Sequence, residues 1–405
     1  MIDFSKKIKN SDKFRTPALT YLASGSYCAY PKGTTEYYNF WDQEVDRCVN
    51  GYTAEDGDYI TGYNYFYLNY CPIQRLVYIT TNGETKKIRQ AAFPDFYDYD
   101  YYFFQAVEEA ESQGKHLVLC KSRRKGYSYK TASMLCRNFF LIPNSKSYVY
   151  ASNKQYLTED GNLTKAWDYM DFIDANTAWG KKRQVANTAM RKRASMLVTD
   201  EFGNKVEMGY KSEIMGVSVK DNPNAVRGKA AKLIVWEEGG SFKELKAAWE
   251  IARPSVEQDG VAFGLMLLFG TGGDEGDNVA GLREAFYDPE AFNCIGFDNI
   301  WDEGAVGGKK CGFFVPQHTN LDVRDSNGNR IYMDEDGNTL HDKARAYILN
   351  LRAKELKSAK DFQQVDRYTA EHAETPAEAF TELSGNIFPK QELQKQLALR
   401  LSMYA

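Results

Sequence analysis

The chain has 405 residues, of which 43% are hydrophobic and 26% charged, and its formal net charge is −4. This composition predicts a globular protein with one large core or two modest ones, and the acidic balance argues against a protein that coats nucleic acid. No segment approaches the roughly 18 apolar residues of a membrane span, and residues 1–10 lack an apolar signal core, so we expect a soluble, intracellular protein. The seven cysteines form no C-x-x-C pair and the four histidines have no metal-ligand spacing, which favours neither a zinc site nor a disulfide framework.

Residues 1–92 combine aromatic side chains with turn signals, which predicts a β-rich lobe of short strands. The densest aromatic runs are YNYFYLNY (63–70) and FPDFYDYDYYFF (93–104). Asn82-Gly83 lies between two segments that can pair, and this predicts a hairpin. Packing within the lobe is the simpler explanation of the aromatic rings, with base stacking as the alternative.

From residue 98 the pattern alternates between helices and apolar strands. Helices are predicted at 98–114, 126–140, 162–173 and 242–252, and strands at 116–120, 147–152, 232–236 and 263–269. Strands separated by helices predict a parallel sheet. Farther on, turns at 325–329 and 334–338 flank an expected strand at 330–333, and a helix follows at 343–358. We therefore expect an aromatic N-terminal lobe or lid (1–112), an α/β core (113–320), and a hairpin, helix and linker (321–405).

The segment CKSRRKGYSYKT (120–131) follows a buried strand and opens a helix, which is the setting of a phosphate-binding loop. Against the pattern G-x-x-x-x-G-K-[ST], Gly126 takes the second glycine and Ser128 the hydroxyl that ligates magnesium. Lys121 replaces the first glycine, and Tyr127 replaces the lysine. Alone, the loop also fits a solvated basic turn.

The missing lysine leaves the phosphate-binding cation to be assigned. Arg123, Arg124 and Lys125 lie inside the loop, where side chains can point toward the β- and γ-phosphates. Lys130 lies in the helix, almost one turn beyond Tyr127, so we expect it to point away from the mouth. The sequence therefore favours one of the three loop residues.

Two further motifs complete a nucleotide site. KLIVWEE (232–238) is an apolar strand ending in two carboxylates, of which Glu237 would hold the magnesium shell and Glu238 would polarise the attacking water. In LLFGTGG (267–273), Thr271 would sense the γ-phosphate. Exposed acids and a glycine-rich turn are the plainer explanations. A basic loop and an acidic strand end about 110 residues apart nevertheless match an additional-strand, RecA-like P-loop ATPase, whose ligands bind at the carboxyl ends of parallel strands.

Together these motifs resemble the large subunit of tailed-phage DNA-packaging terminases, over about residues 93–388. YVYASNK (148–154), NAVRG (224–228), TPAEAF (375–380) and SGNIF (384–388) extend the resemblance. It implies an ATPase motor that uses ATP and Mg²⁺, with residues 122–128 around the phosphates. It also implies a portal ring, a small terminase subunit, double-stranded DNA and ring self-association as partners, in the cytoplasm of an infected bacterium. Tyr127, and Glu237 where aspartate is usual, depart from the family pattern.

Other expectations concern nuclease activity and accessory residues. The only carboxylate side chain after residue 388 is Glu392, so we expect no family-type nuclease in this chain, and residues 389–405 predict an amphipathic helix. Gln105 is a candidate for the adenine pocket and Arg227 for an arginine sensor. The runs KKR (181–183) and RKR (191–193) are candidates for DNA contact, although charge runs are usually solvated. A superfamily-2-like helicase and a non-catalytic DNA-binding or assembly module remain as alternatives.

Overall fold

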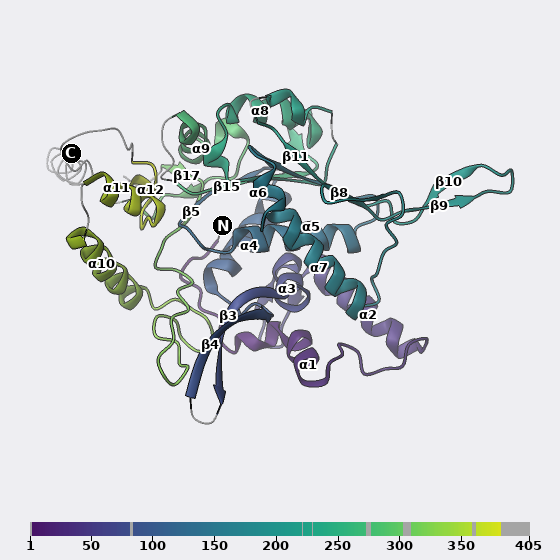
Figure 1. Ribbon diagram of the computed structural model, residues 1–405, viewed down its shortest axis with the longest axis horizontal. Coiled ribbons are helices and arrows are strands. Elements are labelled where there is room, and N and C mark those ends of the chain that lie inside the picture. Colours follow the sequence, from purple (N-terminus) through teal and green to yellow (C-terminus); the bar gives the residue numbers. More distant parts are fainter. Residues whose placement is uncertain are drawn as a thin grey trace.

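A central eight-stranded sheet organises the molecule (Figure 1). The computed structural model describes residues 2–81, 84–220, 222–228, 230–272, 277–302, 309–358 and 362–381. In spatial order the strands are β18 (Phe313–Val315), β5 (Leu117–Lys121), β15 (Leu265–Gly270), β12 (Leu233–Glu237), β6 (Lys146–Ala151), β11 (Glu213–Ser218), β8 (Arg191–Arg193) and β7 (Ala186–Asn187). The first six are parallel, and β8 and β7 are added antiparallel at one edge.

Helices cover both faces of this sheet, as the alternation in the sequence predicted (Figure 1). The helices on one side are α4 (Asp98–Ser112), α5 (Tyr127–Leu141) and α7 (Asn162–Asn176), with the short α6 (Gln155–Thr158) before α7, and those on the other side are α8 (Leu245–Ala252) and α9 (Asp277–Tyr287). Every residue of β5, β12 and β15 is buried, which explains why these strands are continuous apolar runs without alternation. No helix in the described part of the chain is long and apolar enough to cross a membrane.

The strand order confirms the additional-strand arrangement. β15 lies between β5, which leads into the basic loop, and β12, which ends in the two carboxylates. Gly270 pairs with Cys120, and Glu237 pairs with Ala151, so the neighbouring strands end along one edge of the sheet. The loops that follow β5, β12 and β15 are thereby brought together.

The N-terminal aromatic lobe is present, but the prediction that it is rich in strands is wrong. Its helices are α1 (Thr16–Ser24), α2 (Thr35–Asn50) and α3 (Gly62–Tyr70), and its strands are β1 (Tyr52–Thr53), β2 (Tyr59–Ile60), β3 (Ile73–Thr81) and β4 (Glu84–Ala92). The run 63–70 forms α3, in which every residue is buried. A helix buried on all sides has no polar stripe to reveal its period.

The predicted hairpin and the packed aromatic lobe are both found. β3 and β4 pair antiparallel, and Asn82 and Gly83 between them lie outside the described residues. The rings of the lobe pack on one another; for example, the centroids of Tyr27 and Tyr70 are 4.9 Å apart. This accounts for the aromatic content without invoking base stacking.

The segment after the sheet consists of turns and helices. The turns at 325–329 and 334–338 form as predicted, because Asp325 and Asp334 each accept backbone amides on their side chains. The expected strand at 330–333 is not formed, since only isolated bridges flank it, at Arg324–Arg330 and Met333–Thr339. The helices are α10 (His341–Ser358), α11 (Phe362–Glu371) and α12 (Pro376–Ala379). The predicted helix at 389–405 lies outside the described residues.

An arginine cluster around Asp95 joins distant parts of the chain. Carboxylate oxygens of Asp95 lie 2.5 Å from Arg75, 2.9 Å from Arg330, 3.2 Å from Arg15 and 3.3 Å from Arg324. Burial raises the pKa of Asp95, but the guanidinium groups, Arg75 first, outweigh burial and hold this pKa well below its usual range. The cluster therefore ties the N-terminal lobe to the turns that follow the sheet.

Candidate nucleotide site

The basic loop runs from the end of β5 to the start of α5. Gly126 has φ +71°, a left-handed conformation that favours glycine, and Arg124 adopts φ +60°. The amides of Tyr129 and Lys130 both donate to the carbonyl of Gly126 and so close the first turn of α5. The amides before them have no acceptor within the helix, and they make this end suited to an anion.

Ser128 and Glu237 join the loop to the end of β12. The Ser128 hydroxyl donates to the Glu237 carboxyl across 2.5 Å. Asn162, at the start of α7, donates to the other Glu237 oxygen at 3.1 Å and to the Thr131 hydroxyl at 2.6 Å. Burial, followed by the neighbouring Glu238, raises the pKa of Glu237 to about 7, against the lowering effect of the two hydrogen bonds.

Glu238 lies beside this pair and contacts the two neighbouring strand ends. Its carboxylate lies 3.2 Å from the Lys121 ammonium at the end of β5 and accepts a long hydrogen bond of 3.5 Å from Thr271 after β15. Its side chain is 30% exposed, whereas Glu237 is buried at 3%. Glu238 has φ +51°, and its carbonyl accepts the Ser241 hydroxyl at 2.7 Å, which fixes the turn after the strand. The structure thus brings Ser128, Glu237, Glu238 and Thr271 together.

The cations of the loop take different directions. Arg123 is an exposed residue that pairs with Glu371 at 2.6 Å, and Arg124 is exposed with no ion-pair partner among the described residues. Lys125 is buried and donates to the carbonyls of Gln317 and Thr319, both at 2.7 Å. Burial lowers the pKa of Lys125 to about 7. Its side chain is therefore engaged by protein carbonyls, which argues against Lys125 among the three candidates for the phosphate-binding cation.

Lys130 and Tyr127 support the loop from below. The Lys130 ammonium contacts Asp100 at 2.9 Å and the Lys125 carbonyl, which agrees with the expectation that it points away from the mouth. The Tyr127 ring is buried against Phe103, with centroids 4.8 Å apart. The Tyr127 side chain therefore has no access to a nucleotide. Of the groups of Tyr127, only the backbone amide can bind phosphate, as predicted for residues 122–128.

The end of the described chain supports both loops of the site. The Ser122 hydroxyl donates to the Ala373 carbonyl at 2.6 Å, and the Arg123 amide donates to the Glu371 carbonyl at 3.0 Å. Ser122 is buried, and its amide donates to the Val315 carbonyl at 3.1 Å, so both of its hydrogen-bond donors are occupied within the protein. Gly272 packs directly on Ala379, because a Cβ at this glycine would lie 1.9 Å from the Ala379 carbonyl oxygen.

The oxygen atoms at this point fit a magnesium ion that is completed by a nucleotide. Ser128 offers a hydroxyl and Glu237 a carboxylate, and Mg²⁺ in such sites takes few protein ligands besides phosphates and water. No group of three or more His, Cys, Asp or Glu side chains suited to a metal occurs among the described residues. The donor set therefore fits a metal that arrives with its substrate.

Comparisons with known proteins find similarity to solved structures at low sequence identity. No protein-family model matches the chain, and no curated protein sequence matches it. The mutant ATPase domain of the Thermus phage P74-26 large terminase has a TM-score of 0.44 and 14% identity, covering 68% of this chain and 93% of that one. The chain is similar to phage large terminases. The HK97 bacteriophage large terminase gives a TM-score of 0.38 and 12% identity, covering 68% of this chain and 50% of the terminase. Likeness at this level concerns the path of the chain and assigns no role to any residue.

Two residues predicted for the nucleotide site are not brought to the loop. Gln105 is half-buried and hydrogen-bonds with Tyr101. It lies two positions from Phe103 on α4, which turns it roughly 200° away from the side that packs on Tyr127. Arg227 is exposed and donates to Asn224 at 2.9 Å, and no contact joins it to Ser128 or the strand-end carboxylates in the described part of the chain. The position of a residue in the sequence does not show where its side chain points, so the sequence alone could not place Gln105 or Arg227.

The basic runs expected to contact DNA are largely engaged within the chain. Arg183 pairs with Asp174 at 2.5 Å, and Arg191 pairs with Glu213 at 2.7 Å. Lys192 lies over the ring of Trp167, 4.7 Å from its centroid. These contacts account for much of the charge locally, so the runs carry less free positive charge than the sequence suggests.

Sequence reasoning missed Lys121 and Asn162. In the loop pattern, Lys121 only replaces a glycine. A buried lysine at the end of β5 nevertheless requires an ion-pair partner, which predicts a carboxylate nearby. Asn162 opens a helix after the second strand, and no motif marks it. The strand order alone predicts that both positions lie near the end of β12.

Proposed function

We propose that this chain is the ATP-hydrolysing motor of a viral DNA-packaging terminase. The observation that supports this most is the 2.5 Å contact between Ser128, at the start of α5, and Glu237, at the end of β12. It joins a phosphate-binding helix end to a strand-end carboxylate, with Glu238 and Thr271 alongside. Such convergence is what phosphoryl transfer needs, because its catalysis is mostly positioning and charge stabilisation.

Each residue has a role in the proposed reaction. The amides at the start of α5 receive the β- and γ-phosphates, and Ser128 and Glu237 hold the magnesium. The metal neutralises charge on the phosphate oxygens. Glu238 orients the attacking water and accepts its proton, and Thr271 contacts Glu238 from the next strand.

Lys121 joins the proposal as the cation that the loop pattern lacks. Its ammonium contacts Glu238 at 3.2 Å, where it can hold that carboxylate in place and attract the γ-phosphate. Arg123 and Arg124 remain candidates for contacts at the outer side of the loop. Lys125 has no such role, because both carbonyls that it contacts belong to the protein.

The wider function belongs to the same proposal. Hydrolysis would drive double-stranded DNA into a procapsid, with a portal ring and a small terminase subunit as partners, in the cytoplasm of the infected bacterium. The layout of lobe or lid (1–112), ATPase core (113–320) and linker region (321–405) gives the parts that would move against one another.

The test is steady-state phosphate release from ATP by the purified chain, with and without Mg²⁺ and with and without double-stranded DNA. We expect magnesium-dependent release that DNA stimulates. Nucleotide binding without any release would support the non-catalytic module instead. Release that drives strand separation of a duplex would support the helicase.

A further inference from the structure

Glu237 faces one side of the sheet, and its neighbour Trp236 faces the other. Successive side chains of a strand point to opposite faces. Trp236 packs toward α8, with its ring centroid 5.7 Å from that of Trp249. Glu237 instead contacts Ser128 at the start of α5 and Asn162 at the start of α7. The partners of this carboxylate therefore come from the side of the sheet that α5 and α7 cover.

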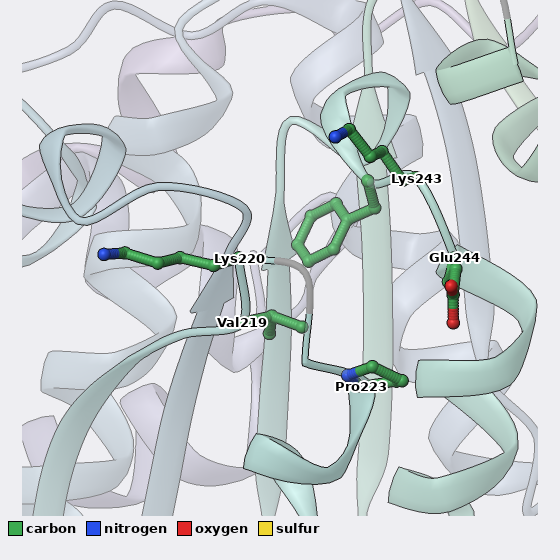
Figure 2. Close-up of a pocket in the computed structure, with 6 residues that line it drawn as sticks. Val219, Lys220, Pro223, Lys243 and Glu244 are labelled. Carbon is green, nitrogen blue, oxygen red and sulfur yellow. The ribbon is translucent and has the colours of Figure 1, made fainter.

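A small slot beside the turn after β12 adjoins the opposite face (Figure 2). It is lined by Val219, Lys220, Pro223, Phe242, Lys243 and Glu244. Phe242 packs on Trp236, with ring centroids 5.5 Å apart, and is only 2% exposed. Packing thus occupies this face of the strand end, which leaves the side of the half-buried Ser128 for a ligand of Glu237.

The side-chain amide of Asn162 is held from two directions. Asn162 is fully buried, and its NH₂ group donates to the Thr131 hydroxyl at 2.6 Å and to the Glu237 carboxylate at 3.1 Å. The Thr131 hydroxyl in turn donates to the Tyr127 carbonyl at 2.9 Å. Because that hydroxyl has given its hydrogen to Tyr127, the amide group that faces it must be the NH₂. Both amide hydrogens are therefore used, one on α5 and one on the carboxylate.

The backbone at the start of α7 is fixed as closely as the amide. Gly161 precedes Asn162, and a Cβ at this glycine would lie 2.1 Å from the Tyr156 carbonyl oxygen. Only glycine permits this close approach between α6 and the start of α7. The position of Asn162 opposite the strand end is therefore set by backbone packing, so its amide can orient the carboxylate.

One polar atom of Asn162 is left without a partner. Its Oδ1 is buried and accepts no hydrogen bond from the residues that the structure describes. Buried acceptors in proteins are normally satisfied by a donor. Magnesium that is held by few protein ligands keeps several waters, and the residues around a metal's ligands commonly receive hydrogen bonds from the metal shell. A metal-bound water is thus a donor that suits this atom.

We propose that Asn162 is a positioning residue for magnesium. It fixes one oxygen of Glu237 while the other stays on Ser128, and its own Oδ1 accepts a hydrogen bond from a water of the magnesium shell. The inference rests on the proposed function, because it requires Glu237 to bind magnesium together with ATP. A purely structural asparagine would join α7 to α5 without any effect on the metal.

Equilibrium binding of a fluorescent ATP analogue to the full chain, over a range of Mg²⁺ concentrations and in EDTA, tests the proposal. We expect the wild-type chain to bind the analogue more tightly with Mg²⁺. Asn162→Ala should raise the Mg²⁺ concentration at half-maximal enhancement roughly 10- to 100-fold and leave the affinity in EDTA unchanged. Asn176→Ala, at the other end of α7, is the matched control and should change neither value.

A second variant tests the same role without altering Asn162 itself. Thr131→Val has nearly the same shape but removes the acceptor that holds the amide. Asn162 keeps its hydrogen bond to Glu237 but loses the support from α5. The Mg²⁺ midpoint should therefore shift in the same direction as in Asn162→Ala, by a smaller factor.

The inference is wrong if Asn162→Ala keeps the wild-type Mg²⁺ midpoint, if Asn176→Ala shifts it equally, or if Thr131→Val leaves it unchanged. A wild-type chain that binds the analogue equally well in Mg²⁺ and in EDTA, or does not bind it, would contradict the proposed function as well. The wild-type titration thus separates a failure of the proposed function from a failure of the role of Asn162.

Discussion

The ammonium of Lys121, at the end of β5, lies 3.2 Å from the carboxylate of Glu238, which follows β12, and the strand β15 lies between these two strands. This pair occupies the position where a nucleotide site needs a cation and a water-orienting group. With Tyr127 turned into the core, Lys121 is a buried cation that contacts Glu238 and whose charge also lowers the pKa of Glu237. In the proposed site, the positive charge therefore comes from the beginning of the loop.

Glu238→Gln should abolish hydrolysis and spare nucleotide binding. The amide keeps the size of the side chain but cannot accept the water's proton, so kcat should fall roughly 10²- to 10⁴-fold. Phosphate release and equilibrium binding of labelled ATP measure the two effects separately. Turnover equal to wild type would show that Glu238 has no catalytic role.

Lys121→Met should weaken ATP binding and lower turnover at least tenfold while the chain stays folded. The ion pair with a partly exposed Glu238 contributes only about 0–1 kcal/mol to stability, so the melting temperature should change little. Lys9→Met, at an exposed position, is the matched control. If nucleotide affinity and turnover were unchanged, Lys121 would not be the phosphate-binding cation, and Arg123 or Arg124 would be the remaining candidates.

Lys125→Met should show the opposite pattern, with a loss of stability and no direct loss of a phosphate contact. Two buried carbonyls lose their donor, which costs roughly 1–3 kcal/mol of unfolding free energy. Urea unfolding measures this loss. Wild-type stability combined with abolished ATP binding would mean that Lys125 faces the nucleotide.

Asp95→Asn should lower the unfolding free energy by roughly 3 kcal/mol at pH 7, because it leaves four arginines without their shared carboxylate. The folded-state pKa of Asp95 is depressed below 3.8. Its stabilisation is therefore present above about pH 4 and is lost as the pH falls through the folded-state pKa.

The variant should accordingly flatten the acid limb of a plot of stability against pH, as measured by urea unfolding between pH 7 and 2. Asp42→Asn, at an exposed position of α2, is the control. A variant whose acid limb has the same slope as wild type would exclude this linkage.

The sequence predicted the sheet better than the lobe, for a physical reason. β5, β12 and β15 are short buried runs between amphipathic helices, and such runs are readable as parallel strands. The run 63–70 is buried on every side, so neither a helical nor a strand period shows in it.

Within the site, the motifs predicted which segments meet but not where individual side chains point. Tyr127 points inward because its ring packs on Phe103. Lys125 points inward because it donates to the carbonyls of Gln317 and Thr319. Those partners are far away in sequence, so a motif comparison could not include them.

Gly272→Ala should impair hydrolysis without touching a proposed catalytic group. The added Cβ would lie 1.9 Å from the Ala379 carbonyl oxygen, so the loop that carries Thr271 and the segment at α12 must move apart. We expect at least a tenfold loss of kcat, measured as phosphate release. Gly180→Ala, where the added Cβ meets its nearest atom at 3.4 Å, is the control. Equal activity of the two variants would show that this contact is dispensable.

The anchoring of Ser122 and Arg123 on residues 371–373, and of Gly272 on Ala379, has a mechanical consequence. A force on the chain beyond residue 381 would therefore act, through these contacts, on the backbone of both loops of the proposed nucleotide site. Conversely, if either loop shifted when the γ-phosphate is lost, residues 371–379 would shift with it. Residues 371–379 would thus couple the proposed nucleotide site to a force on the chain that follows them.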